Sequence, residues 1–237
     1  MKPRASFVIP AFNAQKTLSK ALLSCRTQTI KQIEIIVVND GSTDGTKRII
    51  DAHVNGNERL AADSRIIPIH LEKNVGVSEA RNIGNARASS DLIFVLDSDD
   101  MAARNRVKDT LTIFELKKPD FVYGSFFTLD SFGNVQQKFI SEPFDAELSK
   151  EKKLNFICHS TVAYRKSVAD AIKYEGGAFS KLGLDDWKFQ WDAYRKGFVF
   201  KNIKTPLSYL RKSPEGLTAK RDEKEVLRVK DEYLATL

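Results

Sequence analysis

The first hundred residues alternate between short apolar runs that suit β-strands and amphipathic runs that suit α-helices. The predicted strands cover residues 6–9, 33–38, 65–71 and 92–96, and the predicted helices cover residues 14–28, 47–53 and 77–88. A strand, helix, strand order at this spacing builds βαβ units, in which parallel strands form one sheet with helices on both faces. The sequence therefore predicts an α/β fold around a central sheet.

A cluster of polar residues follows each of the four predicted strands. The clusters are residues 10–13, 39–44, 73–76 and 97–100. In sheets of this kind, ligands bind outside the carboxyl ends of the strands. We therefore expect the four clusters to meet at one edge of the sheet and to form the functional site there.

Beyond Asp100 the pattern becomes less regular. Helices are predicted over residues 104–117, 167–174 and 185–196, strands over residues 121–129, 135–140 and 159–165, a turn over residues 131–134, and a charged helix within residues 219–237. No internal repeat or low-complexity linker separates these segments. We therefore expect a single domain over residues 1–237, made of residues 1–100, residues 101–215 and a helical tail over residues 216–237.

Composition excludes several classes of protein. Hydrophobic residues make up 42% and aromatic residues 10% of the 237-residue chain, which is too many for a mainly disordered protein. The longest apolar runs are far shorter than a membrane span, and the N-terminus has no signal-peptide pattern. Cys25 and Cys158 form neither a disulfide framework nor a zinc cluster, and we expect both to be free buried thiols. These features indicate a cytoplasmic protein.

The positive charge is concentrated in one part of the chain. The net charge is +7, and residues 150–212 contain 14 Lys and Arg against 6 Asp and Glu, whereas the rest is close to neutral. Such an excess can attract nucleic acid, anionic lipid or a phosphorylated ligand, and it suits a solvated surface equally well. Because no recognition helix or RNA-binding motif accompanies it, we expect no nucleic-acid partner.

Three of the polar clusters carry side chains with a possible chemical use. Asp97, Asp99 and Asp100 follow an apolar strand, and Mg²⁺ or Mn²⁺ prefers such carboxylates together with substrate phosphates. The loop over residues 40–46 could bind a base or ribose, and Arg81 could reach an anionic ligand. Each has a structural alternative: an Asp-rich turn, a helix N-cap, and an ion pair of Arg81 with Glu79 or Asp99, respectively.

Together, these segments resemble family 2 of the glycosyltransferases, GT-A fold enzymes that transfer sugars from nucleotide-sugar donors. The resemblance lies in residues 7–13 (FVIPAFN), 40–46 (DGSTDGT), 74–82 (NVGVSEARN) and 96–100 (LDSDD), which follow the family's order and roughly its spacing. Weaker similarities lie at residues 123–124, 133, 160–165 and 184–187. The resemblance implies a GT-A, Rossmann-like fold with a mixed, mostly parallel central sheet.

The resemblance also implies roles for individual residues. The donor-binding residues would be Pro10, Ala11, Asn13, Asp40, Ser42, Asn74, Gly76, Arg81, Asp97 and Arg211. Asp97 and Asp99 would form the family's Asp-x-Asp signature, one contacting ribose and one a divalent cation, Mn²⁺ or Mg²⁺, with Asp100 as a further metal ligand. Residues 1–100 would bind the nucleotide sugar and residues 101–215 the acceptor.

Sugar transfer with inversion needs a carboxylate base that takes the proton of the acceptor hydroxyl. The family's late carboxylate pair resembles Asp185 and Asp186, and we expect Asp186 to be the base and Asp185 an acceptor contact or the alternative base. Acidic residues also occur at helix N-termini without any such role. Many relatives carry a histidine where this chain has Arg211 or Lys212. Either cation could hold the diphosphate instead, which leaves the metal requirement open.

The sequence therefore predicts an inverting glycosyltransferase that uses a nucleotide sugar, UDP-linked, and a glycan or lipid-linked acceptor in bacterial surface-polysaccharide biosynthesis. The alternative is a nucleotide-binding GT-A module without transferase activity. His159 could reach the acceptor cleft. The basic segment and the tail could contact the inner membrane face, although the simpler expectation is that the tail packs on its own domain or on a second copy in a homodimer.

Overall fold

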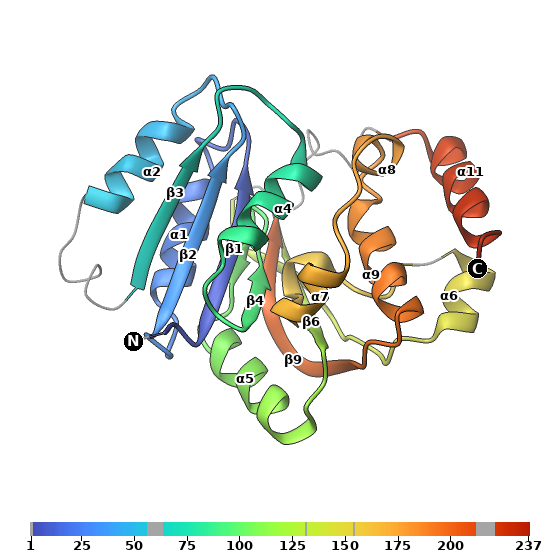
Figure 1. Ribbon diagram of the computed structural model, residues 1–237. Helices are drawn as coiled ribbons and strands as arrows, with labels where there is room; N and C mark the ends of the chain where they lie inside the picture. The colour runs from blue at the N-terminus through green and yellow to red at the C-terminus, as the bar shows by residue number, and fades with distance from the viewer. Residues whose placement is uncertain (1, 56–63, 131, 154, 212–220) are drawn as a thin grey trace.

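A single mixed sheet runs through the computed structural model, which describes residues 2–55, 64–130, 132–153, 155–211 and 221–237 (Figure 1). The strands are β1 (Ala5–Ala11), β2 (Ile33–Asn39), β3 (Ser64–His70), β4 (Leu92–Val95), β5 (Met101–Ala102), β6 (Phe121–Leu129), β7 (Val135–Phe139), β8 (Ala163–Arg165) and β9 (Phe200–Arg211). The helices are α1 (Leu18–Arg26), α2 (Thr46–Asn55), α4 (Val77–Arg87), α5 (Arg106–Lys117), α6 (Ala146–Lys152), α7 (Lys166–Ala171), α8 (Ala178–Lys181), α9 (Asp185–Arg195) and α11 (Glu223–Leu234), with a 3₁₀ turn, η1, over His159–Thr161.

The strand order joins the two halves of the chain. It is β3-β2-β1-β4-β8-β6-β9-β5, and β7 pairs with the outer part of β6. β3, β2, β1 and β4 run parallel, as the βαβ pattern predicts, and β6 and β9 also pair in parallel. β8 lies antiparallel between β4 and β6 and links the halves. The predicted α/β fold with a mixed, mostly parallel sheet is confirmed.

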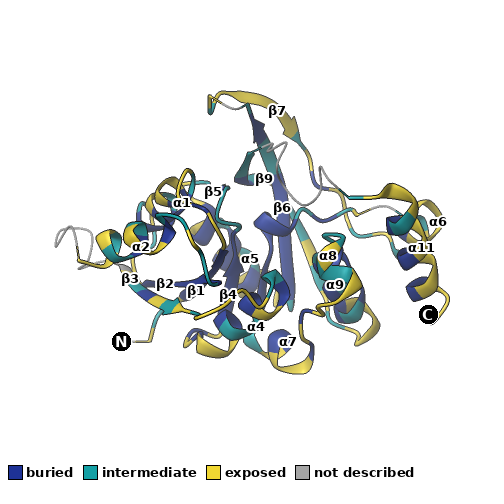
Figure 2. Cartoon of the chain, turned by 90° about the horizontal axis from the view of Figure 1, so that it is seen from above, coloured by how far each residue is buried: buried dark blue, intermediate teal, exposed yellow. Residues whose placement is uncertain are grey.

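Helices cover both faces of this sheet, and β1 and β2 are therefore buried along their whole length. Phe7, Ile9 and Ile35 pack with α1, α2 and α5 on one face. Val8 and Ile36 point to the other face, where α4, α7 and α9 contribute buried side chains. Seen from above in Figure 2, the dark-blue buried strands lie between the two layers of helices. Alternate side chains of an almost fully apolar strand thus supply both cores.

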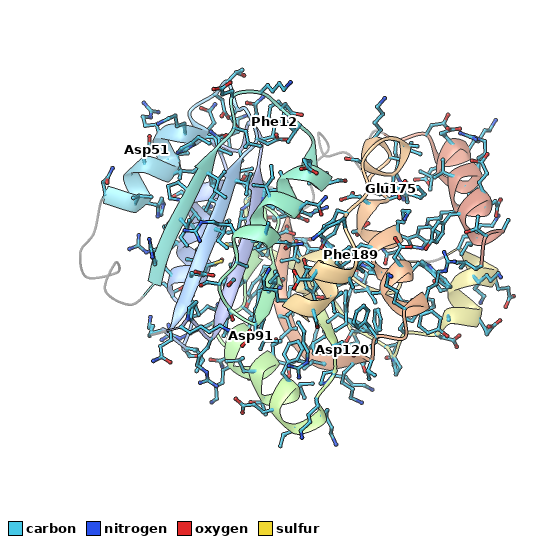
Figure 3. The ribbon with its side chains drawn as sticks, in the orientation of Figure 1. Phe12, Asp51, Asp91, Asp120, Glu175 and Phe189 are labelled. Atoms are coloured by element: carbon cyan, nitrogen blue, oxygen red, sulfur yellow. The ribbon has the colours of Figure 1, made fainter. Side chains whose placement is uncertain are left out.

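The carboxyl ends of the parallel strands lie at one edge of the sheet. Figure 3 shows Phe12, just after β1, at the top of the molecule, whereas Asp91 and Asp120, just before β4 and β6, lie at the bottom. The loops that follow β1, β2, β3 and β4 therefore gather at the top edge, as expected for a parallel sheet.

The tail helix α11 packs on its own chain. Tyr233 and Leu234 share a buried cluster with Trp187 and Trp191 of α9, and Val226 packs with Leu184 in another. The expectation that the tail packs on its own domain is confirmed for the described residues. None of the helices in the described ranges is both long enough and apolar enough to span a membrane.

Two sequence-based predictions need correction. Residues 159–161 form η1 instead of the start of a strand, because the N–H and hydroxyl of Thr161 both donate to the carbonyl of Cys158, at 3.0 and 2.7 Å. Cys25 and Cys158 are free thiols, as predicted, but only Cys25 is buried and Cys158 is partly exposed.

Other elements were not predicted, most notably β9. Charged residues and Pro206 interrupt its alternation, and its register with β6 shifts around that proline. The short elements β5, α6 and α8 were also missed. The predicted turn over 131–134 falls between β6 and β7, where Gly133 N donates to Asp130 O at 3.1 Å. Ser131 itself is outside the described residues.

Candidate active site

The loops after β1 and β2 are tied together by hydrogen bonds between side chains and backbone. Asn13 N donates to the Ser42 hydroxyl at 3.0 Å, and Thr43 N donates to the Asn13 side-chain oxygen at 2.9 Å. Asn13 holds a left-handed backbone conformation with φ of 49°, which asparagine tolerates better than most residues. The structure therefore brings the predicted donor residues of these two loops into contact.

Asp40 ties the loop after β2 to the loop after β3. Its buried carboxylate accepts the N–H groups of Val75 at 2.7 Å and Gly76 at 3.0 Å, and its carbonyl accepts the Asn74 amide at 3.2 Å. Both oxygens thus bind backbone that leads into α4. Asp40, Asn74 and Gly76, which the sequence named as donor residues, form one connected unit.

Gly41→Ala tests how closely these two loops approach. A Cβ at Gly41 would lie 2.4 Å from Asn74 N, and the residue has φ of +65°. We expect the substitution to lower the free energy of unfolding by about 2–5 kcal/mol, from backbone strain plus overlap, as measured by urea denaturation. Gly133→Ala is the matched control, because φ there is +96° but a Cβ would meet no atom within 4 Å. Equal losses in the two variants would contradict the close approach.

Arg81 of α4 connects two carboxylates that are far apart in the sequence. Its guanidinium donates to Asp97 at 2.8 Å and to Asp185 in a very short contact, and its side chain is only 7% exposed. The ring of Tyr174 lies 5.4 Å from the guanidinium carbon. The ion pairs are therefore with Asp97 and Asp185, not with Glu79 or Asp99 as the structural alternative had it. Arg81 joins the loop after β4 to the start of α9.

Asp97 is held by two partners. Burial would raise the pKa of its carboxyl, but Arg81 and the other nearby groups lower that pKa below its usual range. The Ser160 hydroxyl donates to its second oxygen at 3.1 Å and accepts the Asp97 N–H at 3.2 Å. Asp97 is thus an ionised carboxylate with both oxygens engaged, and Ser160 is a supporting residue that the sequence did not single out for the site.

Asp99 and Asp100 have different environments. Asp100 is buried and accepts the N–H of Arg211 at 2.9 Å, and burial followed by the charge of Asp99 raises its pKa well above the usual range. Asp99 is partly exposed, and burial together with the charge of Asp97 raises its pKa to about 6. Asp99 is therefore the more accessible of these two crowded carboxyl groups.

The residues fit a cation that is held mainly by a substrate. In the described part of the chain, no group of three or more His, Cys, Asp or Glu side chains is arranged to hold a metal ion. Mg²⁺, however, is commonly bound by one or two carboxylates plus substrate phosphates. Asp99 offers such a carboxylate, whereas Asp97 is engaged by Arg81 and Ser160. A single principal carboxylate ligand fits this site better than the predicted set of three.

Asp185 and Asp186 begin α9 but face different surroundings. Asp185 is 3% exposed and bound to Arg81, which suits a structural carboxylate better than an acceptor contact. Asp186 is partly exposed, accepts the Asn155 amide at 3.4 Å, and has its pKa raised to about 7 by burial and by the charge of Asp185. Of the two, Asp186 has the access and the pKa of a general base at neutral pH.

The remaining candidate residues are placed as follows. His159 is buried, bonds the Tyr174 hydroxyl at 3.1 Å, and has its pKa lowered to about 3 by burial and by Arg81. His159 is therefore a buried partner of Tyr174. Arg211 ends β9 beside Asp100. Its positive charge opposes part of the rise in the pKa of Asp99. Lys212 lies outside the described residues.

Pro10 and Ala11 are buried within β1 and pair with Val38 and Asn39 of β2. The Asp40 N–H donates to the Ala11 carbonyl at 2.8 Å, which ties the end of β1 to the loop after β2. Neither residue offers a polar side chain. Any donor contact at these two positions therefore involves the backbone or their apolar surface.

Comparison with known proteins decides the family. The sequence profile described as "Glycosyl transferase family 2" matches residues 6–173, which is more than half of the chain. The chain belongs to glycosyl transferase family 2. The match in this family 2 protein includes the four loop clusters and Arg81, whereas Asp185, Asp186 and Arg211 lie beyond it.

One curated relative aligns with most of this family 2 chain. The UDP-Glc:alpha-D-GlcNAc-diphosphoundecaprenol beta-1,3-glucosyltransferase WfaP of Escherichia coli is 28% identical over 206 residues, which cover 87% of this chain and 76% of WfaP. The first curated relatives, at 33% identity, are matched over only 50% and 43% of their length. The chain thus spans about half the length of those proteins.

Solved structures share the fold. TarS of S. aureus, crystallised with UDP-GlcNAc, superposes with a TM-score of 0.74 at 20% identity, covering 97% of this chain and 65% of that one. The mannosyltransferase PcManGT of Pyrobaculum calidifontis, in complex with GDP-Man and Mn²⁺, gives a TM-score of 0.67 at 15% identity, covering 92% and 59%. At this identity the likeness concerns the fold, and it confirms the GT-A architecture predicted for the family 2 chain.

Proposed function

We propose that this family 2 protein is an inverting glycosyltransferase that moves a sugar from a UDP-linked donor to a glycan or lipid-linked acceptor in bacterial surface-polysaccharide biosynthesis. The observation that carries the proposal is the bridge from Asp97 through Arg81 to Asp185. It holds the acidic loop after β4 next to the start of α9, where Asp185 is followed by Asp186.

The relatives support the choice of substrates. WfaP is named for a UDP-glucose donor and a diphosphoundecaprenol-linked acceptor, and TarS was crystallised with UDP-GlcNAc. A UDP sugar and a lipid-linked glycan are therefore the donor and acceptor classes that we propose for this chain. An acceptor of that kind lies at a membrane surface, which agrees with peripheral contact of the basic segment with the inner membrane face.

In the proposed division of labour, residues 1–237 act as one domain. Residues 1–100 bind the nucleotide sugar, residues 101–215 bind the acceptor, and residues 216–237 form the tail. The continuous sheet supports this division, because β8 joins the parallel strands of the first part to β6 of the second.

In the proposed reaction, the oxygen of an acceptor hydroxyl bonds to the anomeric carbon of the donor sugar, and Asp186 accepts the proton of that hydroxyl. The bond from that carbon to the diphosphate oxygen breaks on the opposite face, and UDP leaves with the electron pair. Asp99 would hold a divalent cation, which when bound would offset the charge on the leaving diphosphate. Arg81 keeps Asp97 ionised and fixes α9, and Arg211 supplies a positive charge beside Asp99.

A donor panel tests the proposal. The protein is incubated with UDP-glucose, UDP-N-acetylglucosamine, UDP-galactose or GDP-mannose, with Mn²⁺ and a synthetic lipid-diphosphate-linked sugar as acceptor, and release of nucleoside diphosphate is followed. We expect turnover with one of the UDP sugars and an inverted linkage in the product. Binding of UDP without turnover of any donor would favour the alternative, a nucleotide-binding module without transferase activity.

Asp99→Asn is expected to weaken donor binding only when metal is present. The amide keeps the shape but loses the charge that would hold the cation, so the donor Kd in Mn²⁺ should rise by about 10–100-fold. Without metal the Kd should change little, as measured by calorimetry with UDP. Asp91→Asn, at the opposite edge of the sheet (Figure 3), is the control and should bind as the unmodified protein does. A metal-independent loss would contradict the role of Asp99.

A further inference from the structure

A buried arginine connects three segments of the sheet that lead to the acidic loop. Arg106, the first residue of α5, is 0% exposed. In the described part of the chain its three hydrogen-bond partners are uncharged: the guanidinium donates to the Val95 and Val162 carbonyls at 2.7 and 3.0 Å and to the Ser208 hydroxyl at 3.1 Å. A buried charge is costly unless its partners are well placed. These partners belong to β4, to the end of η1 and to β9, so Arg106 joins the three segments.

Ser208 extends this connection to the acidic loop. The residue is 0% exposed, and its hydroxyl donates to the Ser160 carbonyl at 2.5 Å while it accepts from Arg106. Because a hydroxyl has a single proton, the two contacts run in one direction, from Arg106 through Ser208 to Ser160. The Ser160 hydroxyl then donates to Asp97 at 3.1 Å. Side chains from α5, β9, η1 and the loop after β4 thus form one connected series of polar contacts.

Asp97 is therefore held from two sides. Arg81 of α4 binds one carboxylate oxygen, and Ser160 binds the other. Without the Ser208 hydroxyl, the Ser160 carbonyl and one N–H of Arg106 would lose a partner at a fully buried position. The η1 turn would then be held less firmly, and so would the hydroxyl that fixes the second oxygen of Asp97.

We propose that Ser208 is a positioning residue for donor binding, which acts through Ser160 to orient the Asp97 carboxylate. The inference rests on the proposed function, in which Asp97 belongs to the donor site. It gives β9 two points of support for the acidic loop: Arg211, whose N–H donates to Asp100, and Ser208. Small displacements of a binding group are costly, so a contact outside the site can set the affinity for the ligand.

Ser208→Ala is compared with Ser6→Ala, a closely matched control. Ser6 is also 0% exposed, and its hydroxyl also donates at 2.5 Å, to Glu34, and accepts at 3.1 Å, from the Ser90 N–H. It lies near the start of β1, at the edge of the sheet where Figure 3 shows Asp91. Each hydroxyl has one charged and one neutral partner, so we expect similar losses of stability in urea denaturation.

Calorimetry with UDP and Mn²⁺ separates positioning from stability. We expect Ser208→Ala to raise the UDP Kd by about 3–10-fold, as for the loss of one buried hydrogen bond, and Ser6→Ala to change it by about twofold or less. Where a donor turns over, its KM should rise by the same factor while kcat stays within about twofold. Unchanged UDP affinity in Ser208→Ala, or an equal loss in Ser6→Ala, would overturn the inference. Failure of the unmodified protein to bind UDP would instead refute the proposed function.

A double variant tests the route through Ser160. Ser160→Ala removes the hydroxyl that contacts Asp97 but keeps the carbonyl that Ser208 binds. If Ser208 acts through Ser160, the double variant should bind UDP within about twofold of Ser160→Ala alone. Losses that multiply in the double variant would overturn this route. Ser208→Cys nearly keeps the size but donates only weakly, so it replaces Ser208→Ala if the alanine variant does not fold.

Discussion

Replacing Asp186 with asparagine is expected to lower kcat by about 10²–10⁴-fold while donor binding stays within about twofold of the unmodified protein. The amide has the same shape as the carboxyl group but cannot accept the acceptor's proton. Its effect on folding should be small, because Asp186 is partly exposed and its partners are Asn155 and the Trp187 N–H. Turnover is measured by release of UDP, and donor affinity by calorimetry.

Asp185→Asn tests whether Asp185 has a structural role and Asp186 the role of the base. Asp185 is buried and bound to Arg81, so its loss should lower stability and donor affinity together instead of kcat alone. If Asp186→Asn retains near-normal turnover, Asp186 is not the base. If the selective loss of kcat is found in Asp185→Asn, the two roles are exchanged.

The activity of the unmodified protein should depend on pH through the same group. Burial and the charge of Asp185 raise the pKa of Asp186 to about 7. A base works in its ionised form, so kcat should rise with pH through about 7 and level off above it. At pH 6 only about one tenth of the molecules hold Asp186 ionised. A profile measured from pH 5.5 to 8.5 that is flat, or that falls over this range, would contradict the assignment.

The second large effect is expected at Arg81. Arg81→Met leaves the carboxylates of Asp97 and Asp185 without their shared cation, and removing one partner of a buried ion pair typically costs about 3–5 kcal/mol of the free energy of unfolding. Because the loop after β4 and the start of α9 then lose their connection, donor binding should also be lost. Urea denaturation measures the first effect, and calorimetry with UDP and Mn²⁺ measures the second.

Arg228 provides a matched control. It also bridges two carboxylates, Glu225 and Glu232, but its side chain is 55% exposed on α11. Exposed ion pairs contribute little because water and salt screen them, so Arg228→Met should leave the free energy of unfolding nearly unchanged. A further substitution, Asp185→Asn, should restore part of the stability of Arg81→Met by removing one unpaired charge. Equal costs at Arg81 and Arg228 would contradict the importance of the buried bridge.

The sequence predicted the first half of the fold well, for a physical reason. Buried parallel strands such as β2 are almost entirely apolar, and each is followed by a turn and an amphipathic helix, so their limits can be found locally. β9 lacks this signal because it carries lysines and a proline and gains its order from pairing with β6. A strand that depends mainly on its neighbour leaves little trace in its own sequence.

The candidate site was predicted as a set of residues but not as a network. Arg81, Asp97 and Asp185 were each named, yet no local pattern pairs Arg81 with a residue 104 positions away. That pairing arises only when α4 and α9 pack on the same face of the sheet. Ser160 and Asn155 were missed as supporting residues because a hydroxyl or amide in an irregular segment has no distinctive spacing.

The end of β9 has a consequence for how the protein is made. Asp100 is buried with its carboxyl group against the N–H of Arg211, and the adjoining β5 pairs only with β9 among the described strands. A ribosome therefore completes residues 1–100 well before the strand that finishes their acidic loop exists. If the proposed function holds, the nascent chain should become able to bind its donor only after β9 has emerged.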